Sequence, residues 1–177
     1  MNKYTYGKQT LAQDDINAVL ETLKSDWLTQ GPKVTEFEKA ICEYTGAKYC
    51  VAVANGTAAL HLCTLAAEIT SENEAITSPI TFLASANSIV YAGGIVKFAD
   101  IEEKTACIDP QEIKKQITPK TKALIPVHFT GHTCDMKAIS DIAQENNLIV
   151  IEDAAHAIGS EYKGSKIGAC QYSDMTI

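Results

Sequence analysis

The chain has 177 residues, 46% of them hydrophobic, which is enough for one folded domain with a sizeable core and excludes an intrinsically disordered protein. The formal net charge of -7, without a run of Lys or Arg, argues against a nucleic-acid partner but allows a local positive pocket for a phosphorylated small molecule. The first residues lack the apolar core of a signal peptide and no window is apolar over the length of a membrane span, so we expect a cytoplasmic protein without a membrane partner.

Apolar runs alternate with helical patterns along the chain, which predicts an α/β fold: a three-layer sandwich with a mainly parallel central sheet and helices on both faces. Helices are expected over residues 13–24 and 34–44, the second ending at Gly46. The elements expected after Gly46 are a strand over 49–54, a helix that begins after Asn55-Gly56, a strand over 74–78, a helix over 81–91, a strand over 95–99, a capped helix that starts at Asp109-Pro110, a strand over 122–127, a helix over 135–146, a strand over 148–152, a hairpin over 160–167 and the start of a strand over 173–177.

A carboxylate directly follows the strand expected over 148–152. This residue is Asp153, and His156 comes three residues later in a short loop of small residues. Ligands of open parallel sheets bind at the carboxyl ends of the strands, where an unpaired and partly desolvated carboxylate is costly. The sequence therefore predicts a cationic partner for Asp153, while His156 either donates to that ligand or is an internally bonded histidine.

A second turn carries small residues and a hydroxyl at the start of a helix. The free amides of Gly56, Thr57 and Ala58, with the helix dipole, can hold a phosphate. In the alternative interpretation, Asn55 caps the helix and Gly56 only permits the turn. No GKS or GKT follows and the chain has no GxGxxG, so the turn is not a nucleotide-binding loop of either kind. Because this turn and Asp153 both follow strands, we expect them at the same edge of the sheet.

A phosphate at one point and a cation at the other suggest a single ligand, and pyridoxal phosphate (PLP) carries both groups. A carboxylate beside its ring nitrogen keeps that nitrogen protonated, so that the ring can act as an electron sink. Phe82, at the start of the helix expected over 81–91, could stack on the ring face or else belong to the core.

Metal binding and disulfide bonding are both disfavoured. The loop 128–135 contains two histidines and a cysteine, but their spacing matches no compact zinc motif, and we expect no metal. No CxxC pair occurs, so the scattered cysteines are expected to be reduced, small core side chains: Cys42, Cys50, Cys63, Cys107, Cys134 and Cys170.

Five segments together resemble the first half of a sugar aminotransferase of the DegT/DnrJ/EryC1/StrS type, a PLP-dependent group of fold type I. They are WLTQGP at 27–32, NGTAALHL at 55–62, SPITFLASANSIVYAGG at 78–94, KALIPVHFTG at 122–131 and IEDAAHAIGSEYKGSKIG at 151–168. The resemblance implies that residues 1–32 form an N-terminal segment near the active site and residues 33–177 an incomplete PLP-binding large domain. The family's Schiff-base lysine lies in an SFHPxK-like stretch soon after SDMTI, so it is expected beyond Ile177.

The resemblance also assigns roles within the site. It implies that Gly56, Thr57 and Ala58 bind the cofactor, the last two through amides to its phosphate. Phe82 would stack on the ring, Asp153 would pair with the pyridinium as the catalytic residue present in this chain, and His156 would contact the 3-oxygen.

Within the family, SPITFLASAN and HAIGSEYKG most resemble the transaminase of the pseudaminic acid pathway. That enzyme aminates C4 of a UDP-linked 4-keto-6-deoxy-N-acetylhexosamine with glutamate, and family members form homodimers. The positions that contact the nucleotide sugar in that subgroup correspond to Tyr6, Asp26, Trp27, Leu28, Thr29 and Gly56. Two alternatives remain open: a non-catalytic fragment that binds PLP or a nucleotide sugar, and a PLP-dependent sugar dehydratase with histidine in place of the lysine. An NAD-dependent Rossmann enzyme is disfavoured by the missing glycine fingerprint.

Overall fold

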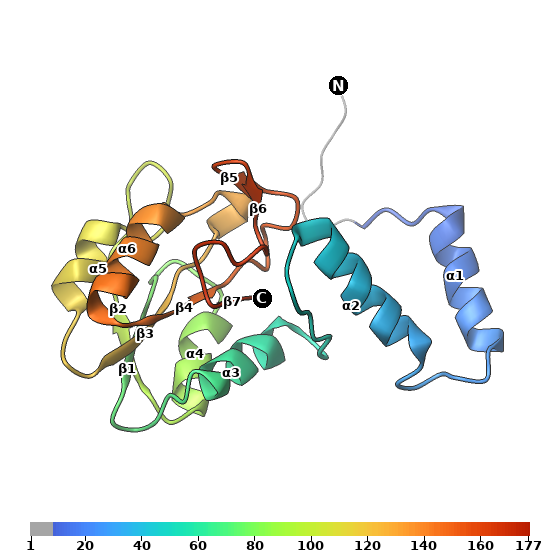
Figure 1. Ribbon diagram of the computed structural model, residues 1–177, viewed down its shortest axis with the longest axis horizontal. Coiled ribbons are helices and arrows are strands. Elements are labelled where there is room, and N and C mark those ends of the chain that lie inside the picture. Colours follow the sequence, from blue (N-terminus) through green and yellow to red (C-terminus); the bar gives the residue numbers. More distant parts are fainter. Residues whose placement is uncertain (1–8) are drawn as a thin grey trace.

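A five-stranded parallel sheet lies between two layers of helices in the computed structural model, which describes residues 9–177 (Figure 1). The strand order is β2-β1-β3-β4-β7, and each of the four neighbouring pairs is parallel. The predicted α/β sandwich is confirmed. The strands are β1 (Glu74–Thr77), β2 (Ile95–Phe98), β3 (Thr121–Ile125), β4 (Ile149–Glu152) and β7 (Met175–Thr176).

One core lies between the sheet and two helices, α5 (Pro110–Gln116) and α6 (Met136–Asn146). From the sheet it takes Ile76, Leu124 and Val150, which are all buried. These residues come from three neighbouring strands and share one face, because side chains alternate between the two faces along a strand.

The opposite face of the sheet packs against α3 (Gly56–Ala66) and α4 (Ala84–Tyr91). Here the strands contribute Ala75, Ile125 and Ile151, which neighbour the residues of the first core in sequence. The three central strands β1, β3 and β4 are therefore apolar on both faces, as expected for a parallel sheet covered on both sides.

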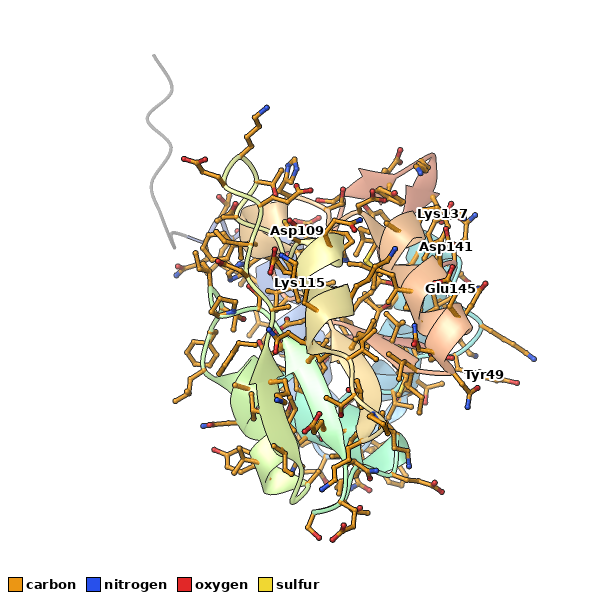
Figure 2. The ribbon with its side chains drawn as sticks, turned by 90° about the vertical axis from the view of Figure 1, so that its left-hand side faces the viewer. Tyr49, Asp109, Lys115, Lys137, Asp141 and Glu145 are labelled. Carbon is orange, nitrogen blue, oxygen red and sulfur yellow. The ribbon has the colours of Figure 1, made fainter. Side chains whose placement is uncertain are left out.

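The outer surface of α6 is charged. Lys137, Asp141 and Glu145 follow one another along the helix in Figure 2, and Lys137 Nζ lies 2.6 Å from Asp141 Oδ2. Their spacing of four residues puts them on one helix face. Ile139 and Ile142, which are buried in the first core, occupy the other side. This amphipathic pattern orients the helix on the sheet.

Two helices stand to one side of the sandwich in Figure 1: α1 (Gln13–Lys24) and α2 (Pro32–Thr45). None of the residues of α1 is buried. The C-terminal end of α2 contacts the sandwich, since Lys166 Nζ lies 3.7 Å from the centre of the Tyr44 ring. Lys166 belongs to the predicted hairpin, which forms as β5 (Glu161–Tyr162) and β6 (Ser165–Lys166).

The strand predicted over residues 49–54 does not form. Tyr49 and Val51 are 78% and 77% exposed, and the N–H of Ala52 donates to Glu38 Oε1 of α2 at 2.9 Å. An unbroken run of small and β-branched apolar residues is typical of a strand, but a strand also needs a backbone neighbour, and none of the described residues supplies one for this segment.

The helix predicted over 81–91 begins three residues later, at Ala84. The preceding residues form a turn in which the N–H of Ser85 donates to the carbonyl of Phe82 at 3.2 Å, and the first helical bond joins Asn87 to Leu83. Thr81 and Phe82 thus belong to the loop between β1 and α4. The other elements form in the predicted order, with small differences at their ends.

Across residues 9–177, no helix is long and apolar enough to cross a membrane. The same residues contain no group of three or more His, Cys, Asp and Glu side chains arranged to hold a metal ion. All six cysteines are free thiols, and two of them, Cys107 and Cys134, are fully buried.

Candidate functional site

Asp153 continues from β4 at the carboxyl edge of the sheet. Its N–H donates to the carbonyl of Pro126 at 2.9 Å, and its own carbonyl accepts from the N–H of His128 at 3.0 Å. It also forms a parallel bridge with Val127. The main chain of Asp153 is therefore held by the segment that continues β3.

The carboxylate of Asp153 is buried, with 6% of the residue exposed. Ser85 Oγ donates to its Oδ2 at 2.6 Å, while Oδ1 accepts a long hydrogen bond of 3.4 Å from the N–H of Ala155. None of the ion pairs among the described residues involves Asp153. A buried carboxylate without a cation is costly, so this environment fits a cationic ligand group such as a protonated ring nitrogen.

The turn at the start of α3 combines the two interpretations that the sequence allowed. Asn55 is the N-cap, and its Oδ1 accepts from the N–H of Ala58 at 2.9 Å. The expectation of three free amides is therefore wrong for Ala58, because its N–H already donates to the side-chain oxygen of the N-cap residue. The N–H groups of Gly56 and Thr57 donate to no acceptor within the described chain.

The turn and Asp153 lie at the same edge of the sheet, as predicted. A Cβ atom at Gly56 would be 3.9 Å from Ile177 Cδ1, and the carbonyl of Ile177 accepts from the N–H of Ala154 at 3.0 Å. Ile177, the residue after β7, thus lies beside both the turn and Ala154, the residue that follows Asp153. The spacing suits a ligand with an anionic and a cationic end.

Phe82 and His156 are exposed to solvent. Phe82 is 74% exposed, so the interpretation of this ring as a core residue is wrong. Its carbonyl lies 3.3 Å from Ser85 Oγ, which links its turn to the group that donates to Asp153. The ring of His156 makes no hydrogen bond with another described residue, which argues against the internally bonded alternative.

Of the residues expected to contact a nucleotide sugar, Gly56 lies in the turn at this edge of the sheet, whereas residues 26–29 are separate from it. Residues 26–29 are exposed in the connection between α1 and α2, which lies away from the sheet in Figure 1. No hydrogen bond joins them to Asp153 or to the turn before α3. Tyr6 is outside the described residues.

Glu152 contributes a second buried carboxylate that the sequence analysis missed. Its Oε2 lies 2.7 Å from His128 Nε2, and the other ring nitrogen of this histidine accepts from the N–H of Cys134 at 3.1 Å. Because Nδ1 is an acceptor, the ring is neutral and Nε2 donates to Glu152. The other carboxylate oxygen accepts from the hydroxyls of Ser173 and Thr176. This network fixes the segment around β7 next to the site.

Ser85 is the other missed residue. It belongs to the first turn of α4, and 68 residues separate it from Asp153 in sequence. The signal for it was a serine in the first turn of a helix that follows a strand, at the edge where Asp153 was expected. Sequence spacing alone could not show that the two side chains meet.

Comparisons with known proteins agree with this arrangement. The model of the DegT/DnrJ/EryC1/StrS aminotransferase family matches residues 9–176. The chain is 48% identical over 164 residues to SpsC, a spore coat polysaccharide biosynthesis protein of Bacillus subtilis, covering 93% of this chain and 42% of SpsC.

Two solved structures illustrate the structural similarity. PseC of Helicobacter pylori, an aminotransferase involved in the biosynthesis of pseudoaminic acid, matches with a TM-score of 0.86 and 33% identity over 94% of this chain and 45% of PseC. NtdA of Bacillus subtilis, solved with bound cofactor PMP, matches with a TM-score of 0.85 and 34% identity over 94% of this chain and 38% of NtdA. The chain thus spans less than half the length of these relatives.

Proposed function

The chain belongs to the DegT/DnrJ/EryC1/StrS aminotransferase family, and on that premise we propose that the whole protein is a PLP-dependent aminotransferase for a nucleotide sugar. The substrate in this proposal is a UDP-linked 4-keto-6-deoxy-N-acetylhexosamine, aminated at C4 with glutamate as the donor. The roles of PseC in pseudoaminic acid biosynthesis and of SpsC in spore coat polysaccharide biosynthesis support a pathway that leads to pseudaminic acid or another cell-surface polysaccharide.

The observation that carries the proposal is the environment of Asp153. This buried carboxylate has a short hydrogen bond to Ser85 at one oxygen and no cationic partner among the described residues. When PLP is bound, its protonated ring acts as the electron sink that makes amino-group transfer possible. Asp153 holds the proton on the ring nitrogen, because a neighbouring carboxylate stabilises the charged form of a base.

The other site residues bind and orient the cofactor. The amides of Gly56 and Thr57 donate to the phosphate at the positive end of α3, and the amide of Ala58 joins them when it exchanges the Asn55 oxygen for a phosphate oxygen. The exposed ring of Phe82 is available to stack on the cofactor.

His156 completes the proposed contacts by donating to the 3-oxygen of the ring. It follows Asp153 by three residues and is exposed. This donor and the carboxylate would thus act at two different atoms of one ring.

The N-terminal segment belongs to the substrate part of the proposal. Residues 1–32, including Tyr6 and the run from Asp26 to Thr29, contact the nucleotide sugar, and residues 33–177 form part of the cofactor-binding domain. Because residues 26–29 lie away from Asp153 of the same chain, a homodimer in which this segment serves the partner subunit's site suits the arrangement.

Substitution of Asp153 tests the assignment in the whole protein loaded with PLP. Glutamate should change the absorbance of the wild-type cofactor, and Asp153→Ala should abolish the change, because the ring nitrogen loses the group that keeps it protonated. Asp135→Asn is the matched control: this carboxylate caps α6, Asn also caps helices, and the response should persist.

The product then distinguishes the activities. A 4-amino sugar supports the aminotransferase, whereas a deoxygenated sugar supports the dehydratase alternative. An Asp153→Ala protein that responds to glutamate like the wild type would refute the assignment of this residue.

A further inference from the structure

Ser85 is buried between the two parts of the site that contact the cofactor ring in the proposal above. It is 0% exposed, and its Oγ lies 2.6 Å from Asp153 Oδ2, 2.7 Å from Thr81 Oγ1 and 3.3 Å from the carbonyl of Phe82. One hydroxyl therefore contacts both the acidic residue and the turn that carries Phe82.

The directions of these hydrogen bonds follow from donor and acceptor chemistry. An ionised carboxylate can only accept, so the single proton of Ser85 goes to Asp153, the much closer of its two acceptors. Ser85 Oγ is then an acceptor for Thr81, whose hydroxyl donates to it. The result is a chain of two hydroxyls that ends at Oδ2 of Asp153, and each bond in such a chain polarises the next.

The two carboxylate oxygens of Asp153 are consequently unequal. Oδ2 has the short bond from Ser85, whereas Oδ1 has the 3.4 Å contact from the N–H of Ala155. A carboxylate fixed in this way keeps Oδ1 as the better remaining acceptor for a ligand N–H.

We propose that Ser85, supported by Thr81, is a positioning residue that holds the Asp153 carboxylate in the orientation in which Oδ1 faces the ring nitrogen of PLP. This inference rests on the proposed function and deepens it. Without the Ser85 hydroxyl the carboxylate is free to rotate, so the ring nitrogen loses the fixed negative charge that favours its protonated form.

The test measures the protonation of the ring nitrogen directly. The whole protein is loaded with PLP that carries an isotopically labelled ring nitrogen, and nitrogen NMR follows its resonance as the pH is varied. In Ser85→Ala the resonance should move toward the unprotonated position, and PLP should bind about tenfold or more weakly. Thr81→Val removes the supporting hydroxyl and keeps nearly the same side-chain size. It should shift the nitrogen resonance and weaken PLP binding in the same direction as Ser85→Ala, but by less.

Ser88→Ala is the matched control. Ser88 is also 0% exposed, lies one turn further along α4, and donates to the carbonyl of Ser85 at 2.9 Å without contacting Asp153. Like Ser85→Ala, the Ser88→Ala variant loses a buried hydroxyl, but it should keep the nitrogen resonance of the wild type. Thermal unfolding of each variant separates loss of stability from loss of positioning.

The outcomes are distinguishable. If Ser85→Ala has the same nitrogen resonance and PLP affinity as Ser88→Ala, the positioning role is refuted while the proposed function stands. If Ser85→Ala does not fold, Thr81→Val decides, because a wild-type resonance in that variant also refutes the proposal. If wild-type protein does not bind PLP, or binds it with an unprotonated ring nitrogen, the proposed function fails as well.

Discussion

At the scale of single residues, Asn55 and the phosphate of the proposed cofactor site would compete for one N–H group. The side chain of Asn55 accepts from Ala58 at the start of α3 at 2.9 Å. A phosphate bound at the amides of Gly56 and Thr57 would reach the same amide, since helix N-termini bind anions through consecutive N–H groups. In this proposal the Ala58 N–H donates to Asn55 when the site is empty and to the phosphate when the cofactor is bound.

This competition predicts the behaviour of Asn55→Ala. Without PLP the variant should be less stable by about 1 kcal/mol, because α3 loses its N-cap. With PLP the deficit should shrink, since the phosphate replaces the cap, so PLP should raise the melting temperature of the variant more than that of the wild type. Thermal unfolding of the whole protein with and without PLP measures both effects.

Asp109→Ala provides the control. Asp109 caps α5 and accepts from the N–H of Gln111 at 2.7 Å. Its substitution therefore removes an N-cap comparable to Asn55, but from a helix other than α3. Its response to PLP should equal that of the wild type. An equal response in Asn55→Ala would mean that the side chain and the phosphate do not share the Ala58 amide.

At the scale of elements, the Tyr162 hydroxyl joins the β5–β6 hairpin to the start of α6, where it accepts a hydrogen bond from the N–H of Lys137 at 3.3 Å and donates one to Asp135. The hydroxyl of Tyr162 in β5 donates to Asp135 Oδ1 at 2.5 Å, and Asp135 is the N-cap of α6. The tight turn of the hairpin places Lys163 and Gly164 at positive φ, as hairpin turns of two residues require. The Tyr162 hydroxyl is also the main reason that the pKa of Asp135 lies below its ordinary value of 3.8.

The lowered pKa makes the contribution of this bond dependent on pH. A carboxyl group with a depressed folded-state pKa stabilises the protein above its unfolded value, and the stabilisation disappears as the pH falls through the folded value. Tyr162→Phe should therefore reduce stability by about 1 kcal/mol or less at neutral pH. The deficit should fade as the pH falls below 3.8 and through the lower folded value.

Chemical unfolding at neutral and acidic pH checks this prediction. Tyr172→Phe is the control, because the Tyr172 ring packs edge-on against Tyr162 at 5.5 Å between centroids, while no hydrogen bond joins Tyr172 to Asp135. Its effect should not vary with pH in this window. A Tyr162→Phe deficit that is constant from neutral to acidic pH would exclude the link to Asp135.

At the scale of the whole molecule, the outer face of α3 exposes large apolar side chains. Leu62 and Leu65 are about half exposed on this helix, and Val90 and Tyr91 are similarly exposed on the neighbouring α4. Contiguous apolar surface of this kind marks an interaction site in soluble proteins. The proposed homodimer is one way in which it would be covered.

We expect the 177-residue chain, produced by itself, to associate through this face. The double substitution of Leu62 and Leu65 by Lys should shift it toward a monomer, because burying two charges in an interface is unfavourable. Glu145→Lys on the outer surface of α6 changes the net charge by the same amount at a site in a charged row, and should leave the association unchanged. Analytical ultracentrifugation measures the result, and equal behaviour of both variants would show that overall charge, not this face, controls association.

The limits of sequence reasoning are clearest at three positions. The segment 49–54 is an apolar run of the kind found in strands, but it has no backbone neighbour among the described residues. The amide of Ala58 is engaged by Asn55, a choice that local sequence left open. Ser85 escaped notice because its partner Asp153 is 68 residues away.

The sequence by itself determined the order of strands and helices apart from the strand expected over 49–54, the position of Asp153 after a buried strand, and the family resemblance that the comparisons confirm. These features depend on periodicity, on capping and turn residues, and on motifs of adjacent residues, which are all local. Only the tertiary structure decided which polar groups meet at the sheet edge: Ser85 with Asp153, and His128 with Glu152. Such contacts depend on how distant elements pack together, and spacing along one chain does not specify that geometry.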